Sequence, residues 1–480
     1  MQRIAELAVA AAESAGASYA DARAVRQRQQ RVVVKNGGVD SLSSSESAGV
    51  GVRVVCDGAW GFASTSGTDE RSVADVAREA VEIARASARV TGKPVELAPV
   101  EPAVDDVGHW ARQDPFDVPV AEKIDLLMAC DAAMAVQGVV VRSGSVFSSR
   151  EEKWFAGSEG ARLRQERIVT GAGIEATAAG PGDTQRRSYP SSHGGQTGTR
   201  GWELVEELAL EQHAREIAEE AVALLKADPC PQGKMDLILA EGQLALQVHE
   251  SCGHPIELDR VLGTEASFAG RSFLTPDKLG TFRYGSEAVS IVADATLPGA
   301  LGSFGYDDEG VPAQRSEIVT AGIFRGYLTS RETAPALGLS SNGSMRADGW
   351  NRAPLVRMTN ISLLPGTAGS LADLIRDTDD GLLLCSNLSW SIDDRRLNFQ
   401  FGCEAGYRIK GGELVGLVRN PSYQGITPEF WGSCDAVCGE QGWRVWGVAN
   451  CGKGEPMQTM QVGHGVAPAR FRQVTVGVAR

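Results

Sequence analysis

The sequence lacks three features that would direct it to a membrane, a nucleic acid or a disulfide scaffold. No stretch approaches the roughly 20 consecutive apolar residues that a membrane helix needs. Lys and Arg number 47 against 61 Asp and Glu, and the net charge of −14 disfavours nucleic acid and anionic membrane surfaces as partners. The cysteines are nine, an odd number without framework spacing, which fits a reducing cytoplasm. The Ala-rich start is interrupted by acidic residues, which indicates an amphipathic helix instead of a secretion signal.

One short segment carries the strongest chemical signal. His249-Glu250-Ser251-Cys252-Gly253-His254 places a carboxylate between two imidazoles, as in zinc peptidases, but with the histidines five residues apart instead of four. On a regular α-helix this spacing separates the side chains by about 140°. A shared metal therefore requires a loosened helix, and a π-type turn would bring the two histidines nearly into line. Gly253 lowers the cost of that distortion.

A catalytic zinc usually has three protein ligands and one open position, so a third ligand is needed besides His249 and His254. Cys252 should leave the helix on another face, and a structural zinc site at Cys434 and Cys438 would need a second pair that is not evident. We expect His464 to be structural or substrate-facing. Arg260, Arg315 and Arg357 could bind a substrate or form structural ion pairs. The chemically possible third ligands are Glu257, Asp259, Cys252, His464, the Cys434/Cys438 pair and Cys451.

Beside the motif, the sequence contains in order Gly49 to Val54 with Gly58 to Ala63, then Glu257, Asp259 and Arg260 behind the motif, Asp307 to Arg315, Val356 to Asn360, and Asn450 to Gly454. Together with the motif, these segments resemble the TldD/PmbA (TldD/TldE) family of zinc peptidases. The motif marks the catalytic TldD-like branch, because the TldE/PmbA branch lacks it. The resemblance implies that Cys451 is the third ligand, although Gly454-Glu455-Pro456 departs from the Gly-Gln that often follows in the family.

The expected function is that of a cytoplasmic, zinc-dependent peptidase acting on small or unstructured peptides, with zinc held by His249, His254 and Cys451. Glu250 would take a proton from a zinc-bound water and pass it to the leaving amine. Two alternatives stay open: a non-catalytic TldE-like subunit, and a peptide-binding protein with a structural zinc that has four protein ligands. The resemblance also implies peptide maturation and pairing with a homologous TldE-like subunit in a heterodimer, or a homodimer.

The length exceeds that of one compact core and predicts an α+β, multi-domain chain. We expect an N-terminal α/β domain at 1–90, a connection at 91–119, a central α/β domain at 120–228 and a large, strand-rich catalytic domain at 233–480 that carries the metal-site helix. Residues 20–28 and 30–35 are predicted to be paired strands before a hairpin turn at Asn36-Gly37-Gly38. Residues 181–201 are predicted to form a mobile, Gly-rich loop, and residues 202–226 one helix.

Overall fold

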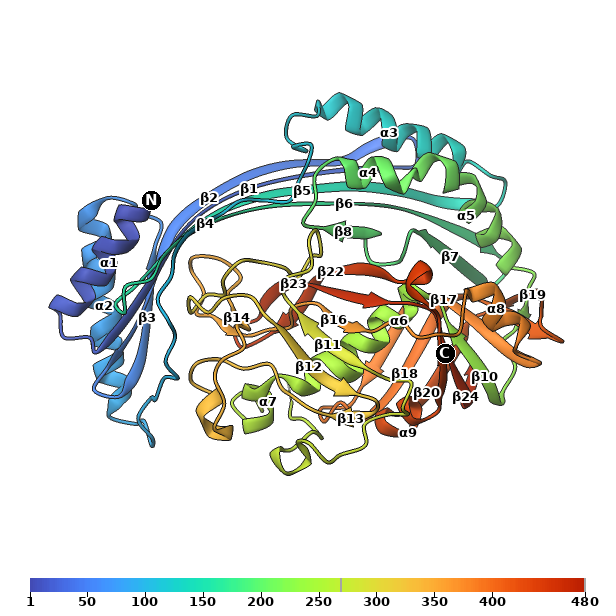
Figure 1. Ribbon diagram of the computed structural model, residues 1–480. Coiled ribbons are helices and arrows are strands. Elements are labelled where there is room, and N and C mark those ends of the chain that lie inside the picture. The colour runs from blue at the N-terminus through green and yellow to red at the C-terminus, as the bar shows by residue number, and fades with distance from the viewer. Residues whose placement is uncertain (268–269, 479–480) are drawn as a thin grey trace.

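The computed structural model describes residues 1–267 and 270–478. A long curved sheet arches over a strand-rich C-terminal part, and helices lie at the N-terminal end and on the convex face of the sheet (Figure 1). The expected α+β class is therefore confirmed. None of the helices in the described ranges is long and apolar enough to cross a membrane.

The arching sheet has eight strands in the order β3-β2-β1-β5-β6-β4, with β7 and β8 also paired to β6. Four of them have 17 to 19 residues and at about 3.3 Å per residue are close to 60 Å long. β1 pairs with both β2 and β5, so the sheet runs through both predicted N-terminal units, and the domain limits stay a prediction. The strands are β1 (Tyr19–Lys35), β2 (Gly38–Cys56), β3 (Ala59–Thr65), β4 (Val104–Val107), β5 (Val139–Gly157), β6 (Arg162–Gly180), β7 (Asp183–Tyr189) and β8 (Gln196–Gly198).

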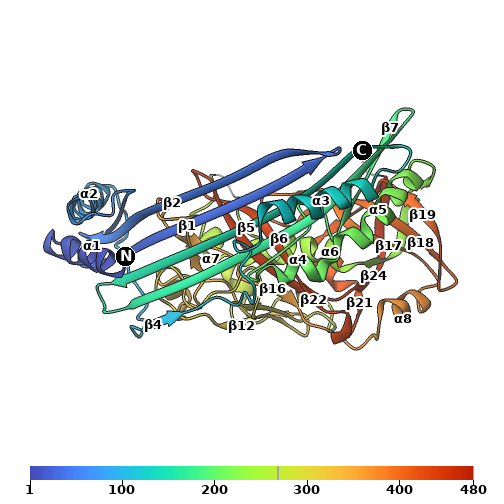
Figure 2. The ribbon, with the colours of Figure 1, turned by 90° about the horizontal axis from the view of Figure 1, so that it is seen from above.

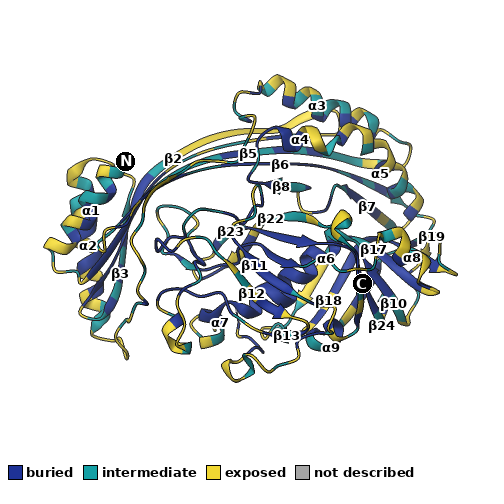
Figure 3. Cartoon of the chain, viewed as in Figure 1, coloured by how far each residue is buried: buried dark blue, intermediate teal, exposed yellow. Residues whose placement is uncertain are grey.

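Two of the local expectations in this sheet are wrong. Residues 20–35 form one continuous strand, since nothing at position 29 turns the chain, and the hairpin occurs only at Asn36 (φ +48°) and Gly37 (φ +80°). Residues 181–201 contain β7 and β8 instead of a mobile loop, because both pair with β6. The predicted hairpin turn is confirmed. Seen from above, β2 lies along one edge of the sheet (Figure 2), and its first half is exposed (Figure 3).

Five helices cover this sheet. α1 and α2 bury Ala and Val side chains against the N-terminal end of β1 and the C-terminal end of β2. Asp69 caps α2 by accepting the N–H groups of Arg71 and Ser72. The predicted helix at 202–226 is split at Ala209, whose φ is +48°. The helices are α1 (Gln2–Ser14), α2 (Glu70–Ala88), α3 (Val120–Ala133), α4 (Glu203–Leu208) and α5 (Leu210–Leu224).

The C-terminal part is built around a second eight-stranded sheet. Its strands follow the order β17-β10-β24-β20-β18-β19-β9, and because β17 also pairs with β18, five of them close into a ring. The strands are β9 (Asp228–Pro229), β10 (Gly233–Leu239), β17 (Asp380–Ile392), β18 (Asn398–Lys410), β19 (Glu413–Arg419), β20 (Pro421–Ile426), β21 (Cys434–Val437) and β24 (Ala469–Val478).

Smaller sheets and short helices complete this part and enclose the largest hydrophobic core. They are the sheet β13 (Ile323–Phe324), β12 (Arg315–Thr320), β11 (Ile291–Asp294), β16 (Ile361–Leu363), the pairs β14 (Met345–Arg346) with β15 (Leu355–Val356) and β22 (Arg444–Lys453) with β23 (Gln458–Val466), and the helices α6 (Glu241–Val248), α7 (Leu258–Leu262), α8 (Leu371–Arg376) and α9 (Thr427–Gly432).

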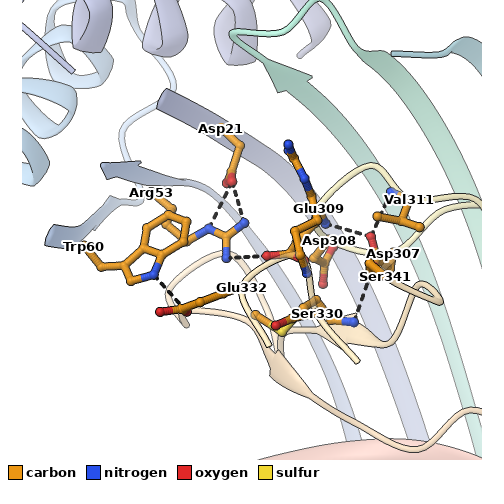
Figure 4. Close-up of polar contacts among 12 residues, drawn as sticks. Asp21, Arg53, Trp60, Asp307, Asp308, Glu309, Val311, Ser330, Glu332 and Ser341 are labelled. Carbon is orange, nitrogen blue, oxygen red and sulfur yellow. Dashed lines mark hydrogen bonds and ion pairs between the residues drawn. The ribbon is translucent and has the colours of Figure 1, made fainter. Parts of the chain in front are cut away.

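A buried ion-pair network joins the arching sheet to the C-terminal part (Figure 4). Arg53 on β2 contacts Asp21 on β1 at 2.6 Å and Glu309 at 3.1 Å. The Asp307 carboxylate accepts the backbone N–H groups of Glu309 and Val311 and so shapes this loop. Burial, together with the neighbouring Glu309, raises the pKa of Asp307. The acidic segment Asp307 to Glu309 thus lies at the junction between the arching sheet and the C-terminal part.

Candidate metal centre

The motif lies where α6 changes its winding. The α-helix becomes a π-helix at His249–Gly253 and then a 3-10 turn at His254–Ile256, so the expected π-type turn is confirmed. Both histidines are buried, and their ring centroids lie 4.9 Å apart. Gly253 has an ordinary right-handed φ of −65°. Its small size is needed for another reason, because a Cβ there would lie 2.1 Å from the Met358 sulfur.

Cys451 is brought to the two histidines by β22. The ladder with β23 shifts register between Val448 and Cys451, a bulge of the kind that redirects a side chain. The Cys451 sulfur lies 3.7 Å from Nε2 of His254. One ligand atom from each of His249, His254 and Cys451 lies within 4.8 Å of the other two, and within residues 1–267 and 270–478 these three form the one such group of His, Cys, Asp or Glu.

Hydrogen bonds fix which nitrogen each histidine offers. His464 Nδ1–H donates to the Ile361 carbonyl, so His464 Nε2 accepts from Nδ1–H of His249 at 2.8 Å. His254 Nδ1–H donates to the Glu257 carboxylate at 3.1 Å. In both His249 and His254, Nε2 therefore carries no hydrogen and has a lone pair that can bind a metal. Such outer partners orient and strengthen metal-binding imidazoles.

The electrostatic environment favours the protonation states that bind a metal, which are neutral imidazoles and a thiolate. Burial lowers the pKa of both His249 and His254, which keeps the rings neutral. Burial raises the pKa of the Cys451 thiol, but the charge that His254 carries when it is protonated, together with Arg357, outweighs burial, and the pKa lies below its ordinary value. Burial likewise opposes ionisation of Glu257, yet Lys453 and His254 hold its pKa well below the usual range.

Glu250 lines a cavity of about 280 Å³ together with the three metal-type side chains. Its carboxylate accepts a hydrogen bond from Arg396 at 2.7 Å. Burial lowers the pKa of Arg396 below its ordinary value, although the neighbouring Glu250 carboxylate acts in the opposite direction. The cavity is also lined by Ser191, Ser192 and His193, which follow β7 on the arching sheet. The pocket therefore has a floor in the C-terminal part and a wall from the predicted central unit.

Comparison with known proteins gives the family. Models of the PmbA/TldA metallopeptidase C-terminal domain, domain 1 and central domain match residues 232–478, 20–84 and 113–225. The chain belongs to the PmbA/TldD metallopeptidase family. This membership, which the sequence motifs indicated, supports a metallopeptidase in general.

Curated relatives and solved structures agree with this membership. A metalloprotease of Methanothermobacter thermautotrophicus is 32% identical over 96% of this chain and 95% of its own length. A metalloprotease TldD homolog of Haemophilus influenzae is 26% identical over 96% of this chain and 92% of its own length. The solved structure of TldE from Thermococcus kodakarensis has a TM-score of 0.71 and 19% identity, over 99% of this chain and 100% of its own. A Thermotoga maritima protein that carries the name of a DNA gyrase modulator has a TM-score of 0.77 and 19% identity, over 99% of both chains. These two likenesses show the fold alone.

Two residues of the other PmbA/TldD-type segments, Arg357 and Lys453, hold the hairpin that carries Cys451 and are not themselves part of the metal group. Arg357 donates to the backbone carbonyls of Cys451 and Gln458 and so holds the β22–β23 hairpin. Lys453, fully buried, donates to Asp259 at 2.7 and 2.8 Å. These contacts tie the hairpin to the segment behind the motif.

The remaining candidates do not line the cavity. Arg260 pairs with Glu257, and Arg315 forms an exposed pair with Glu317. Cys252 contacts the Tyr284 hydroxyl, and burial raises the pKa of its thiol to about 12. Cys434 and Cys438 are buried thiols, and burial raises their pKa values to about 12 and about 11.

Sequence reasoning missed Arg396 and the wall from the arching sheet. Arg396 is separated from Glu250 by 146 positions and sits in a turn that carries no motif. The sequence predicts Ser191 to His193 only as part of the mobile, Gly-rich loop at 181–201. The sequence does offer one signal for Arg396: Asp393-Asp394-Arg395-Arg396 is a charged turn between two apolar strands, and such a hairpin tip often carries function.

Proposed function

We propose that this chain is the catalytic subunit of a zinc-dependent peptidase that hydrolyses small or unstructured peptides. The observation that carries the proposal is the position of Glu250: it follows a ligand-type histidine on the π turn and opens into the same cavity as His254 and Cys451. A purely structural metal site has no use for a carboxylate that faces the cavity beside the ligands.

The donor set fits zinc. Two neutral imidazoles and a thiolate are ligands that Zn²⁺ accepts, and buried outer partners already orient both imidazoles. The described chain contributes three members to the group, which favours a site with an open position over a closed four-ligand site. When bound there, zinc would polarise the carbonyl of the substrate and make water easier to deprotonate.

The chain's own residues carry the proton steps. Glu250 takes a proton from the attacking water and passes it to the departing amine, so that a peptide bond breaks and a water is consumed. The cavity walls exclude bulk solvent from this exchange, since His249, Glu250, His254 and Cys451 are each at most 5% exposed as whole residues.

The shape of the cavity supports an extended substrate. Val448, Ala449 and Asn450 of β22 line it directly before Cys451, so a peptide laid along this strand passes the metal group. Pairing with a strand edge uses backbone hydrogen bonds and places few demands on side chains. A cavity of about 280 Å³ admits a peptide segment and excludes a folded domain.

The assembly we propose is a pair with a homologous TldE-like subunit. The first half of β2 is an exposed edge strand, and its residues 38–49 pair on one side only within the described ranges. Such an edge can add a strand from a second chain. Light scattering of the chain alone and mixed with a TldE-like homologue distinguishes the heterodimer, which we expect, from a homodimer.

The decisive test is Glu250→Gln. This variant should keep its zinc and fold and lose nearly all hydrolysis of internally quenched, unstructured peptides, because only proton transfer is removed. Glu455→Gln, on an exposed turn of the β22–β23 hairpin, is the matched control and should cleave like the parent protein. Turnover of Glu250→Gln close to that of the parent would refute the mechanism.

A further inference from the structure

We propose that Arg396 is a second catalytic residue, whose guanidinium binds the carbonyl oxygen of the scissile peptide bond and stabilises the negative charge that develops on it. The inference rests on the proposed peptidase function and names the group that acts on the oxyanion. It starts from the contact between Arg396 and Glu250.

The backbone of Arg396 is firmly placed. The residue lies at the tip of the β17–β18 hairpin with a φ of +63°, a left-handed conformation that a side chain other than Gly seldom adopts. Its N–H donates to the Asp393 carbonyl at 2.8 Å, and its own carbonyl accepts from the Thr427 hydroxyl at 2.9 Å. An unusual backbone conformation that the surroundings hold in place is typical of functional positions.

The guanidinium has donors to spare inside the cavity. Nη1 donates to Glu250 at 2.7 Å and Nε is buried, whereas the other terminal nitrogen, Nη2, donates to none of the residues that the structure describes. The side chain is 17% exposed and lines the cavity with His249 and Cys451. Guanidinium offers five N–H donors and no acceptor, so the unused ones call for an oxygen from a bound molecule.

The movement of charge during hydrolysis explains why this oxygen should be the attacked carbonyl. Water loses a proton to Glu250 while its oxygen attacks the carbonyl carbon, and the π electrons of the carbonyl move onto its oxygen. Glu250 thus becomes neutral at the moment when the substrate oxygen becomes negative. Because Arg396 touches Glu250, its positive charge stays beside the group that exchanges the proton throughout the reaction.

This exchange stabilises the transition state more than the bound substrate. In the resting protein the guanidinium is paired with the Glu250 carboxylate, and a neutral carbonyl gains little from it. When the tetrahedral intermediate collapses, the electrons on oxygen re-form the carbonyl, the C–N bond breaks, and the proton on Glu250 moves to the amine. Arg396 then regains its carboxylate partner. Interactions that strengthen only as the reaction proceeds raise kcat more than they lower KM.

The test compares Arg396→Gln and Arg396→Lys in the zinc-loaded, full-length protein with its TldE-like homologue present. On internally quenched, unstructured peptides Arg396→Gln should lower kcat by about 10²- to 10³-fold and change KM by less than about threefold, as for loss of one oxyanion donor. Lys, with a charge but no planar fork, should retain part of the rate. Guanidinium ion should restore part of the activity of Arg396→Ala. Arg395→Gln, at the same hairpin tip but exposed and outside the cavity lining, is the matched control.

A phosphinic peptide separates this role from mere positioning of Glu250. Its tetrahedral, negatively charged group imitates the oxyanion, so Arg396→Gln should weaken its binding at least about 30-fold even when Glu250 is already Gln. An unchanged affinity in that background would overturn the proposal, since a residue that only positions Glu250 has no effect once Glu250 is gone.

Two further outcomes also decide. Loss of cleavage by Arg396→Gln only for peptides with a free C-terminal carboxylate, and not for their amides, would overturn it in favour of carboxylate recognition. If the parent protein and Glu250→Gln are equally inactive while both bind zinc, the peptidase function itself fails. Full activity of Arg396→Gln beside an inactive Glu250→Gln sinks the Arg396 inference alone.

Discussion

Replacing Gly253 by Ala tests why the motif has a glycine before its second histidine. Gly253 has right-handed backbone angles, so Ala fits the backbone and by helix propensity alone would stabilise it by about 1 kcal/mol. The added Cβ, however, would lie 2.1 Å from the sulfur of Met358 and 3.1 Å from its terminal methyl. Met358 is fully buried in the main core and has little room to move.

Overpacking of this kind costs about 1–3 kcal/mol, which exceeds or cancels the gain in propensity. We therefore expect Gly253→Ala to lower the free energy of unfolding of the C-terminal part by up to about 2 kcal/mol, obtained as the overpacking cost of about 1–3 kcal/mol reduced by the propensity gain of about 1 kcal/mol. Urea titration, with hydrogen exchange of peptides from residues 232–262 as the local readout, measures this change. The same turn carries His249 and His254, so zinc affinity should fall in parallel.

A double-mutant cycle isolates the clash. Met358→Ala alone should cost about 2–5 kcal/mol, but the pair Gly253→Ala/Met358→Ala should cost less than the sum of the two single changes, because the second substitution removes the obstacle. Gly432→Ala on α9, where a Cβ would meet nothing within 4 Å, is the control. If the cycle shows no coupling between Gly253→Ala and Met358→Ala, the steric explanation is wrong.

The remaining predictions concern the metal group and the substrate. Cys451→Ala should lose most of its zinc by metal analysis, whereas Cys434→Ala should keep it; full retention by Cys451→Ala would remove that residue from the site. His464→Leu, which takes away the acceptor for His249 Nδ1–H, should weaken zinc binding about 10- to 100-fold in a chelator competition, and His464→Gln should lose less. Incubation with a rigid folded protein without loose tails should give no fragments, while the same protein unfolded is cut; efficient digestion of the folded form would contradict an enclosed site.

The motif predicted the local structure of the metal centre because its chemistry is contained in a few adjacent residues. The spacing of His249 and His254 on one helix leaves few geometries that bring both imidazoles to one point, and a π turn is one of them. The hairpin at Asn36-Gly37 and the cap at Asp69 were predictable for the same reason, since both depend on contacts within three residues.

Other features depend on partners far along the chain. Residues 181–201 carry many turn-forming residues, yet they form strands because β6 supplies hydrogen bonds and Glu404 accepts from Ser188 and Arg186. The role of Gly253 depends on Met358, which is 105 positions away. Local propensity contains no information on such contacts, so neither could be read from the sequence.

The wall of the metal pocket has a consequence for how relatives of this protein can diverge. The side chains to which we assign the chemistry all come from residues beyond 232, whereas Ser191, Ser192 and His193 reach the pocket from the segment that follows β7. A chimera that takes its first 230 residues from one homologue and the rest from another should therefore keep the reaction of the second parent and cut a different set of peptides. Substrate preference can therefore change while the catalytic mechanism is conserved, because different parts of the chain determine the two.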